Sequence, residues 1–378
     1  MNDNAQPNSL TQLLSKKGDL QVAETKRARS KSILSPLAAY SHAVFVSNYF
    51  SWDEEMHGDG RLVVDLSEKL AAGLDISTTF STFNNLERKY PPDKALYIAV
   101  NCDVIGRNVV SIRINNDCTS YGPNSDFYFE PFFTPFNIKF PADAFIYPIK
   151  TLPSRATPDN IVKEALKYPF ASDGRPVIAF MLRDPELGDL VKIKQTADIL
   201  RQKHQAKFLI STGPRTCQET DRRIQRIFAD FADTKMVLWN KLEKDQNPYL
   251  GILGNATHLV TSGTLSTTSD LFATGKPVYY TDTPMFVSES IEMRNRLFAD
   301  GAVGEFDSHM LSRDPPPAKI RRSYHEAWDK LSQKFCDDLN VLLGARECRT
   351  KSRPVKGRPS LIDNFGGTPK PWPHLTLG

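Results

Sequence analysis

Cysteine is scarce in this sequence, and its distribution excludes two kinds of covalently or metal-stabilised protein. The five cysteines are scattered along the 378 residues, and no CxxC spacing occurs. An odd number of unclustered cysteines supports neither a disulfide framework nor a zinc site. We therefore expect reduced thiols.

Long apolar runs are also missing. None approaches the roughly 18 residues that a membrane-spanning helix requires. The segment before Tyr40 has no hydrophobic signal-peptide core, and its acidic residues argue against an organelle transit peptide. The sequence therefore predicts a cytoplasmic protein, or one peripheral to the inner face of the membrane.

A basic surface is missing from the body of the chain. Residues 1–40 carry a net charge of +3 and residues 345–378 carry +5, whereas the whole chain carries +4, which leaves about −4 between them. This balance argues against a nucleic-acid partner for the folded part. We predict that residues 1–38 form a flexible polar tail and 345–378 a basic, proline-rich tail, and that these tails make a weak peripheral contact with an acidic membrane.

Common nucleotide and metal motifs are absent as well. Neither GxxxxGK[ST] nor GxGxxG occurs in the loops considered below, which argues against a P-loop kinase and a dinucleotide-binding enzyme. No HExxH occurs, and we predict no metal and no resident cofactor.

The second half of the chain shows a regular alternation of strands and helices. Predicted strands cover 177–182, 207–211, 235–239, 257–262 and 278–281, and predicted helices cover 189–203, 219–231, 247–254 and 266–274. Such alternation predicts a parallel sheet in a Rossmann-like domain, which we place at 175–318. A helix near 288–298 and a long helix at 320–343 follow, the latter assigned to a separate C-terminal element at 319–344.

The first half shows a shorter alternation. A strand at 43–47 and a helix at 61–72 are followed by strands at 95–100 and 109–114, which lie too close together for a full crossover helix. We therefore predict an abridged Rossmann-like domain at 39–150 and a linker at 151–174 that contains a helix at 159–167. The predicted fold class is α/β, with two Rossmann-like domains facing a cleft that would hold the ligand.

An aromatic run covers residues 126–150 and contains seven phenylalanines. We expect these side chains to pack against the sheet or to line the seam between the domains. A base-stacking surface is the functional alternative.

The stretch 247–282 carries the best candidate ligand site. A loop that follows a parallel strand and begins a helix directs free N–H groups and a positive dipole end at a ligand, and so favours a phosphate. Hydroxyl residues crowd this turn: Thr261, Ser262, Thr264, Ser266, Thr267, Thr268 and Ser269. Asp270, one turn into the helix, either accepts hydrogen bonds from a ribose or simply favours the helix dipole.

Two other loops contain candidate residues. In the segment from Ser211 to Thr216, Arg215 either holds a diphosphate or lies in the first turn of a surface helix. In the acidic loop at 48–60, His57 or Asp59 is either a general base or a solvated side chain. We interpret Gly275-Lys276-Pro277 mainly as the end of a helix.

The run NPYLGILGNATHLVTSGTLSTTSDLFATGKPV resembles the signature of the mitochondrial fission ("elongated mitochondria") family of bacteria and plants, which is close to NPYxGxLAxADxIVVTxDSxSMxSEAxxTGKPV. Other pieces match in the same order: LPSRATPDNI, FLISTGPRT, a Trp-Asn pair, and MRNRLFADGAVGEFD. The resemblance covers residues 125–306.

This resemblance implies a GT-B-like glycosyltransferase that binds a nucleotide-sugar in its second domain and an acceptor in its first. The nucleotide-diphosphate-sugar would be a co-substrate, and the acceptor a cell-envelope glycan, another glycan or a lipid-linked molecule. On this basis we assign donor binding and catalysis to specific residues. The donor residues are Ser211, Arg215, Thr216, Asn247, Tyr249, Thr264, Ser266 and Asp270, and the catalytic residues are His57 and Asp59.

The chain departs from the family pattern at several positions. Gly263-Thr264 replaces Asp-Ser, Asp270 replaces Glu, and Arg183-Asp184 replaces Gly-Gly. These changes indicate a divergent member. The alternative function is a non-catalytic interaction protein of the same fold that docks on a membrane or a protein partner, and a sugar epimerase or phosphorylase is a third reading.

Overall fold

The computed structural model describes a large part of the chain. The described residues are 37, 40–46, 58–74, 76–81, 95–101, 109–114, 125–132, 140, 143–170, 173–182, 185–213, 216–241, 248–282 and 288–352.

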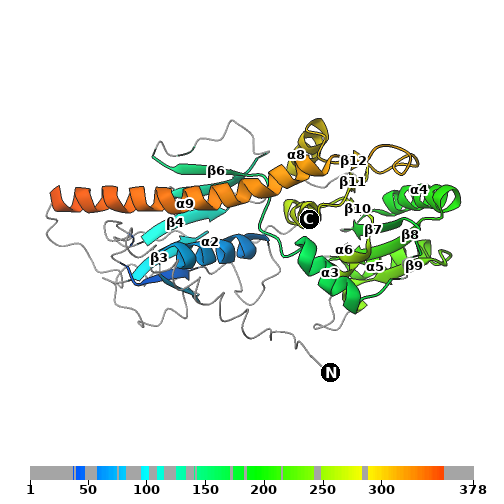
Figure 1. Cartoon of the computed structure of the whole chain (residues 1–378), viewed down its shortest axis with the longest axis horizontal. Coiled ribbons are helices and arrows are strands. Elements are labelled where there is room, and N and C mark those ends of the chain that lie inside the picture. The colour runs from blue at the N-terminus through cyan, green and yellow to red at the C-terminus, as the bar shows by residue number, and fades with distance from the viewer. Residues whose placement is uncertain are drawn as a thin grey trace, which may run out of the picture.

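Two parallel six-stranded sheets lie side by side, one in each half (Figure 1). The first has the order β2 (Ser77–Ser81), β1 (His42–Val46), β3 (Ala95–Val100), β4 (Val109–Ile114), β5 (Phe127–Pro131) and β6 (Phe145–Ile149). The second has the order β12 (Gly304–Glu305), β11 (Val278–Tyr280), β10 (His258–Thr261), β7 (Val177–Leu182), β8 (Lys207–Thr212) and β9 (Thr234–Val237). The predicted α/β fold class with two Rossmann-like halves is confirmed.

Helices flank both sheets. In chain order they are α2 (Gly58–Leu74), α3 (Pro158–Lys167), α4 (Leu187–His204), α5 (Gln218–Ile227), the short 3-10 helix η3 (Trp239–Lys241), α6 (Tyr249–Asn255), α7 (Leu265–Ala273), α8 (Ser288–Ala299) and α9 (Ala318–Ser352). None of these described helices is long and apolar enough to cross a membrane.

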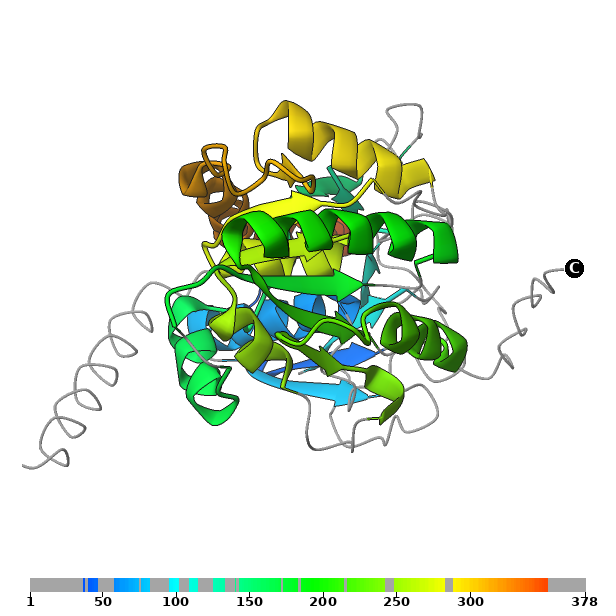
Figure 2. The ribbon, with the colours of Figure 1, turned by 90° about the vertical axis from the view of Figure 1, so that its right-hand side faces the viewer.

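The second sheet is covered on both faces by helices close to it in sequence. Along β7, Ile178 and Phe180 pack with the buried side chains of α4 and α5, whereas Val177 and Ala179 face a second core that includes α6 and α7. Figure 2, which views this half from its end, shows α4 (Leu187–His204, green) lying over the sheet and running roughly along its strands. Alternating side chains of fully buried strands therefore serve two helical layers, as expected for a parallel sheet.

The first sheet has more strands than the sequence predicted. The strands β2, β5 and β6 were missed, and β5 and β6 are formed by the aromatic run. This sheet therefore has as many strands as the second, and the described residues between β2 and β6 include no helix.

The C-terminal helix α9 returns from the second half to cover the first sheet (Figure 1). Phe335 packs edge-on against Phe127 with ring centroids 5.0 Å apart, and Phe129 lies near both Phe335 and Trp328. Because Phe127 and Phe129 are completely buried, they cannot stack on a nucleic-acid base, and the base-stacking alternative is wrong for them. The helix also continues to Ser352, beyond its predicted end.

Helix α3, in the segment that connects the two halves, packs against α6 of the second half. Thr157 caps its first turn, and Pro158 is its first residue, one position before the predicted start. Helices α3 and α6 approach so closely at Gly254 that an added Cβ there would lie 2.2 Å from the Ile161 carbonyl oxygen. Asn255 then donates to the Tyr168 carbonyl at 2.6 Å. The end of α6 thus packs closely against α3.

Candidate functional site at the start of helix α7

The carboxyl edges of the two sheets both lead to α7. Strand β10 ends at Thr261 and enters α7 through three residues. Strand β6 ends at Ile149 and continues into a segment whose Leu152 N–H donates to the Ser269 hydroxyl at 2.8 Å. In open parallel sheets the carboxyl edge is the usual place for a ligand. Helix α7 therefore lies where both halves can contribute to one site.

The first turn of α7 is held by hydroxyl groups. The Thr264 Oγ1 accepts from the Thr267 N–H at 3.5 Å and lies 3.0 Å from the Ser266 Oγ. Thr264 is therefore the N-cap residue, and it satisfies one of the free N–H groups at the helix start.

Gly263 is required by the close approach of its neighbours. A Cβ at this position would lie 2.4 Å from the Thr261 hydroxyl and 3.1 Å from the Thr267 Cβ. The Asp of the family signature does not fit here unless those side chains move. The departure at Gly263 is thus matched by the packing around it.

Ser262 precedes this glycine and has an unusual environment. Its hydroxyl oxygen is shielded from solvent and has no hydrogen-bond partner within the described chain. An unsatisfied buried hydroxyl costs free energy, and in native proteins it calls for an explanation such as an absent ligand or water. Ser262 is one of the hydroxyl residues that crowd this turn in the sequence, but the sequence alone does not distinguish it from the others.

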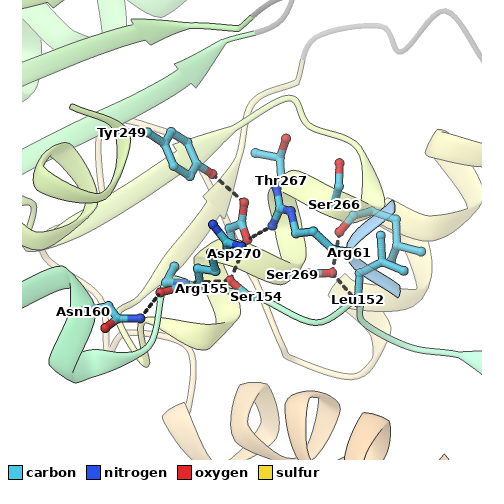
Figure 3. A network of polar contacts seen from close by, with 12 residues as sticks. Arg61, Leu152, Ser154, Arg155, Asn160, Tyr249, Ser266, Thr267, Ser269 and Asp270 are labelled. Atoms are coloured by element: carbon cyan, nitrogen blue, oxygen red, sulfur yellow. Dashed lines mark hydrogen bonds and ion pairs between the residues drawn. The ribbon is translucent and has the colours of Figure 1, made fainter. Parts of the chain in front are cut away.

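Asp270 is the centre of a polar network that joins both halves (Figure 3). One carboxylate oxygen accepts from Arg61 at 2.5 Å and from the Ser154 hydroxyl at 2.6 Å, and the other accepts from the Tyr249 hydroxyl at 3.1 Å. The donors come from α2, the segment after β6, and α6. The Asp270 side chain is only 5% exposed.

The network fixes the charge states of its donors. Burial by itself lowers the pKa of the Arg61 guanidinium, but attraction to Asp270 and the hydrogen bond to it outweigh burial and leave that pKa raised. Burial, together with the Asp270 charge, raises the pKa of the Tyr249 phenol well above its usual value. Arg61 is therefore a cation and Tyr249 a neutral donor at neutral pH.

The loop after β8 lies two strands away from this site, about 10 Å along the same sheet edge. Ser211 and Thr216 are buried, and the Thr216 hydroxyl accepts from the Gly213 N–H at 3.1 Å. Asp221, which the sequence did not single out, accepts from the Thr212 hydroxyl at 2.8 Å and from the Asn240 side chain at 2.9 Å. Asn240, the second residue of the Trp-Asn pair, thus supports this loop.

Several predicted site residues lie outside the described residues. They are His57, Arg215 and Asn247, and the side chain of Asp59 is also not described, although its backbone lies in the first turn of α2. Their predicted roles stay predictions. The predicted roles of Tyr249 in a base pocket and of Asp270 in ribose binding also stay predictions, with both side chains engaged in the network above.

Lys276, in the Gly-Lys-Pro run, supports α6. Its ammonium group donates to the carbonyl oxygens of Leu253, Gly254 and Ala256 at 2.6–2.7 Å. Burial lowers its pKa to about 8, while the three carbonyl oxygens favour the charged form. Gly275 has a left-handed backbone (φ 72°) just after α7, which confirms the predicted helix end.

In the described part of the chain, no three His, Cys, Asp or Glu side chains are grouped to hold a metal ion. The described residues of the site provide a helix start, hydroxyl groups and the ion pair of Arg61 with Asp270.

Residues 146–330 match the family model described as Mitochondrial fission ELM1. This match confirms the resemblance drawn from the sequence signature. No curated protein matches the chain in sequence.

Several solved structures resemble this chain at low identity. A sucrose-phosphate synthase from Thermosynechococcus elongatus has 12% identity, covers 81% of this chain and 100% of its own, and gives a TM-score of 0.46. A glycosyltransferase from Rickettsia africae has 10% identity, with coverage of 80% and 98% and a TM-score of 0.45. A UDP-GlcNAc 2-epimerase from Neisseria meningitidis, bound to UDP-GlcNAc, has 11% identity, with coverage of 77% and 93% and a TM-score of 0.43.

Proposed function

We propose that this protein binds a nucleotide-diphosphate-sugar at the start of α7 and transfers the sugar to a glycan acceptor held by the first half. The proposal rests on one observation above all: the buried Ser262 hydroxyl, which has no partner among the described residues, lies beside the hydroxyl-lined start of a helix at the carboxyl edge of a parallel sheet. A helix start favours an anion through its free N–H groups and its dipole. A phosphate oxygen would supply the acceptor that Ser262 lacks.

In this proposal the diphosphate lies against Thr264 and Ser266, and Arg215 from the loop after β8 adds a cation. Ser211 and Thr216 support that loop. These donors would stabilise the charge that develops on the departing diphosphate, so that no metal is obligatory.

The residues proposed for the nucleobase pocket, the ribose and the proton transfer come from the sequence resemblance. Asn247 and Tyr249 would shape the base pocket, and Asp270 would bind the ribose only if one of its three donors moved away. If the reaction inverts the configuration at the sugar carbon, His57 or Asp59 takes the proton of the acceptor hydroxyl. The acceptor oxygen then bonds to the sugar carbon as the bond from that carbon to the diphosphate breaks. The acceptor would be a cell-envelope or other glycan, or a lipid-linked molecule.

Ser262→Ala tests the central observation. Removing a hydroxyl that has no partner should leave the melting temperature of the free protein unchanged or slightly raised. It should weaken binding of a nucleoside diphosphate by about 1.5–3 kcal/mol, the usual value for a hydrogen bond to a charged group. Calorimetric titration of UDP, GDP and ADP into wild type and variant measures the binding, and thermal unfolding without nucleotide measures the melting temperature.

Two further variants complete this test. Arg215→Ala should abolish nucleoside-diphosphate binding, and unchanged binding would remove Arg215 from the site. Thr274→Ala, at the other end of α7, is the control, because its hydroxyl donates to the Leu271 carbonyl and lies far from the helix start. It should lower stability without changing the affinity for nucleotide.

One observation favours a second function, that of a non-catalytic interaction protein. The Asp270 carboxylate is already occupied by Arg61, Ser154 and Tyr249, as expected of a structural group. A thermal-shift series with nucleoside diphosphates near 1 mM discriminates the transferase from the interaction protein. A ligand that binds only the native state raises the melting temperature by mass action. No shift with any of them would favour the interaction protein.

A further inference from the structure

One side chain of the first half crosses to α7. Arg61 lies in the first turn of α2, and its partner Asp270 is 209 residues away in sequence. Figure 3 shows Arg61 reaching from α2 to the side of α7, where it meets the carboxylate near Ser266 and Thr267. The contact therefore joins the helix that follows β1 to the helix that follows β10.

Three charged residues lie in a row along α2, and the ion pair at one end of the row is much less exposed than the pair at the other end. Arg61, Asp65 and Lys69 are spaced four residues apart and so share one helix face. Asp65 accepts from the Trp328 indole at 2.6 Å and Lys69 donates to Asp329 at 3.2 Å, so these two face α9. The side chains of the Lys69 pair are 41% and 68% exposed, whereas those of the Arg61 pair are 18% and 5% exposed.

This difference matters energetically. An exposed ion pair contributes little, but a buried one must have its remaining hydrogen bonds satisfied, or the cost of desolvation exceeds the attraction. Asp270 meets that condition through Ser154 and Tyr249. A buried pair of this kind fixes one arrangement of its two elements.

We infer that Arg61 is a positioning residue: by pairing with Asp270 it fixes the first turn of α2 beside α7, so that the two helix starts contribute to one anion site. The inference rests on the proposed function. The two helices begin after strands β1 and β10 of different sheets, and each start carries a positive dipole end. Their combined effect on a diphosphate depends on the distance between them, which the Arg61 pair sets.

The prediction concerns the phosphate end of the ligand and not its base. Arg61→Gln should weaken binding of UDP by about tenfold while the affinity for uridine changes less than twofold, because the dipole effect acts on charge and falls off beyond the first turn. Asp270→Asn should weaken UDP binding to a similar extent, and the double variant should be no worse for UDP than either single one, since both remove the same contact. Arg61→Lys should restore part of the UDP affinity.

Lys69→Gln is the matched control. It removes the exposed pair two turns along the same helix face and should leave the UDP to uridine affinity ratio unchanged. If Arg61→Gln lowers only the melting temperature and leaves that ratio as in wild type, the pair is merely structural and the inference is wrong.

A ligand-free measurement separates this inference from the proposed function. Amide hydrogen exchange should become faster in the first turns of α2 and α7 in Arg61→Gln, but not in Lys69→Gln. If wild type binds no nucleoside diphosphate, the proposed function fails, and the exchange result alone decides whether Arg61 positions the two helix starts. Unchanged exchange in both turns would overturn the inference.

Discussion

The two halves have sheets of the same size and the same parallel arrangement, yet they are covered in different ways. The second sheet is enclosed by helices that follow its own strands, with α4 and α5 on one face and α6 and α7 on the other. The first sheet relies on α2 and on α9, a helix from the end of the described chain. The second half is therefore built from local connections, whereas the first depends on a contact between distant parts of the sequence.

The largest predicted effect breaks that distant contact. Phe335→Ala removes a fully buried ring that packs on Phe127, Phe129 and Tyr147, and it should lower the free energy of unfolding by about 3–5 kcal/mol. Hydrogen exchange should quicken in β5 and β6 before it does in β7 and β8. Equal loss of protection in both sheets would show that the halves unfold as one unit. Val341→Ala, an exposed position on α9, should change stability by no more than about 0.5 kcal/mol.

An intermediate effect on stability is expected where α3, in the segment between the two halves, packs against α6 of the second half. Gly254→Ala puts a methyl group against the Ile161 carbonyl, and it should cost about 1–3 kcal/mol by separating α3 from α6. Gly188→Ala, in α4, meets no atom within 4 Å and should be neutral or stabilising by up to about 1 kcal/mol. Urea unfolding of the two variants measures the difference, and equal midpoints would contradict the close approach.

The smallest effect concerns the site itself. Thr264→Ala removes the cap of α7 and should cost about 1 kcal/mol of stability. It should also weaken nucleoside-diphosphate binding, because Thr264 lies at the helix start. Thr157→Ala, which removes the equivalent cap of α3, should cost about as much stability without affecting nucleotide binding. The same loss of binding in both variants would mean that it reflects stability alone.

The strands that the sequence predicted well are rich in apolar residues. The strand at 177–182 and the strands at 95–100 and 109–114 agree with the structure at both ends, because fully buried parallel strands need apolar residues on both faces. The missed strand β6 lies at a sheet edge, contains Pro148 and alternates between buried and exposed residues. Proline is tolerated at an edge, so composition gave no sign of a strand.

The sequence by itself determined the α/β class, the alternation in the second half, and the phosphate-favouring start of α7. These follow from periodicity, helix caps and hydroxyl spacing, which act over a few residues. Only the tertiary structure decided that Asp270 binds Arg61, that Ser262 has no partner among the described residues, and that α9 completes the first half. Such contacts join residues hundreds of positions apart, and the free energy that selects them comes from burial, which no local pattern records.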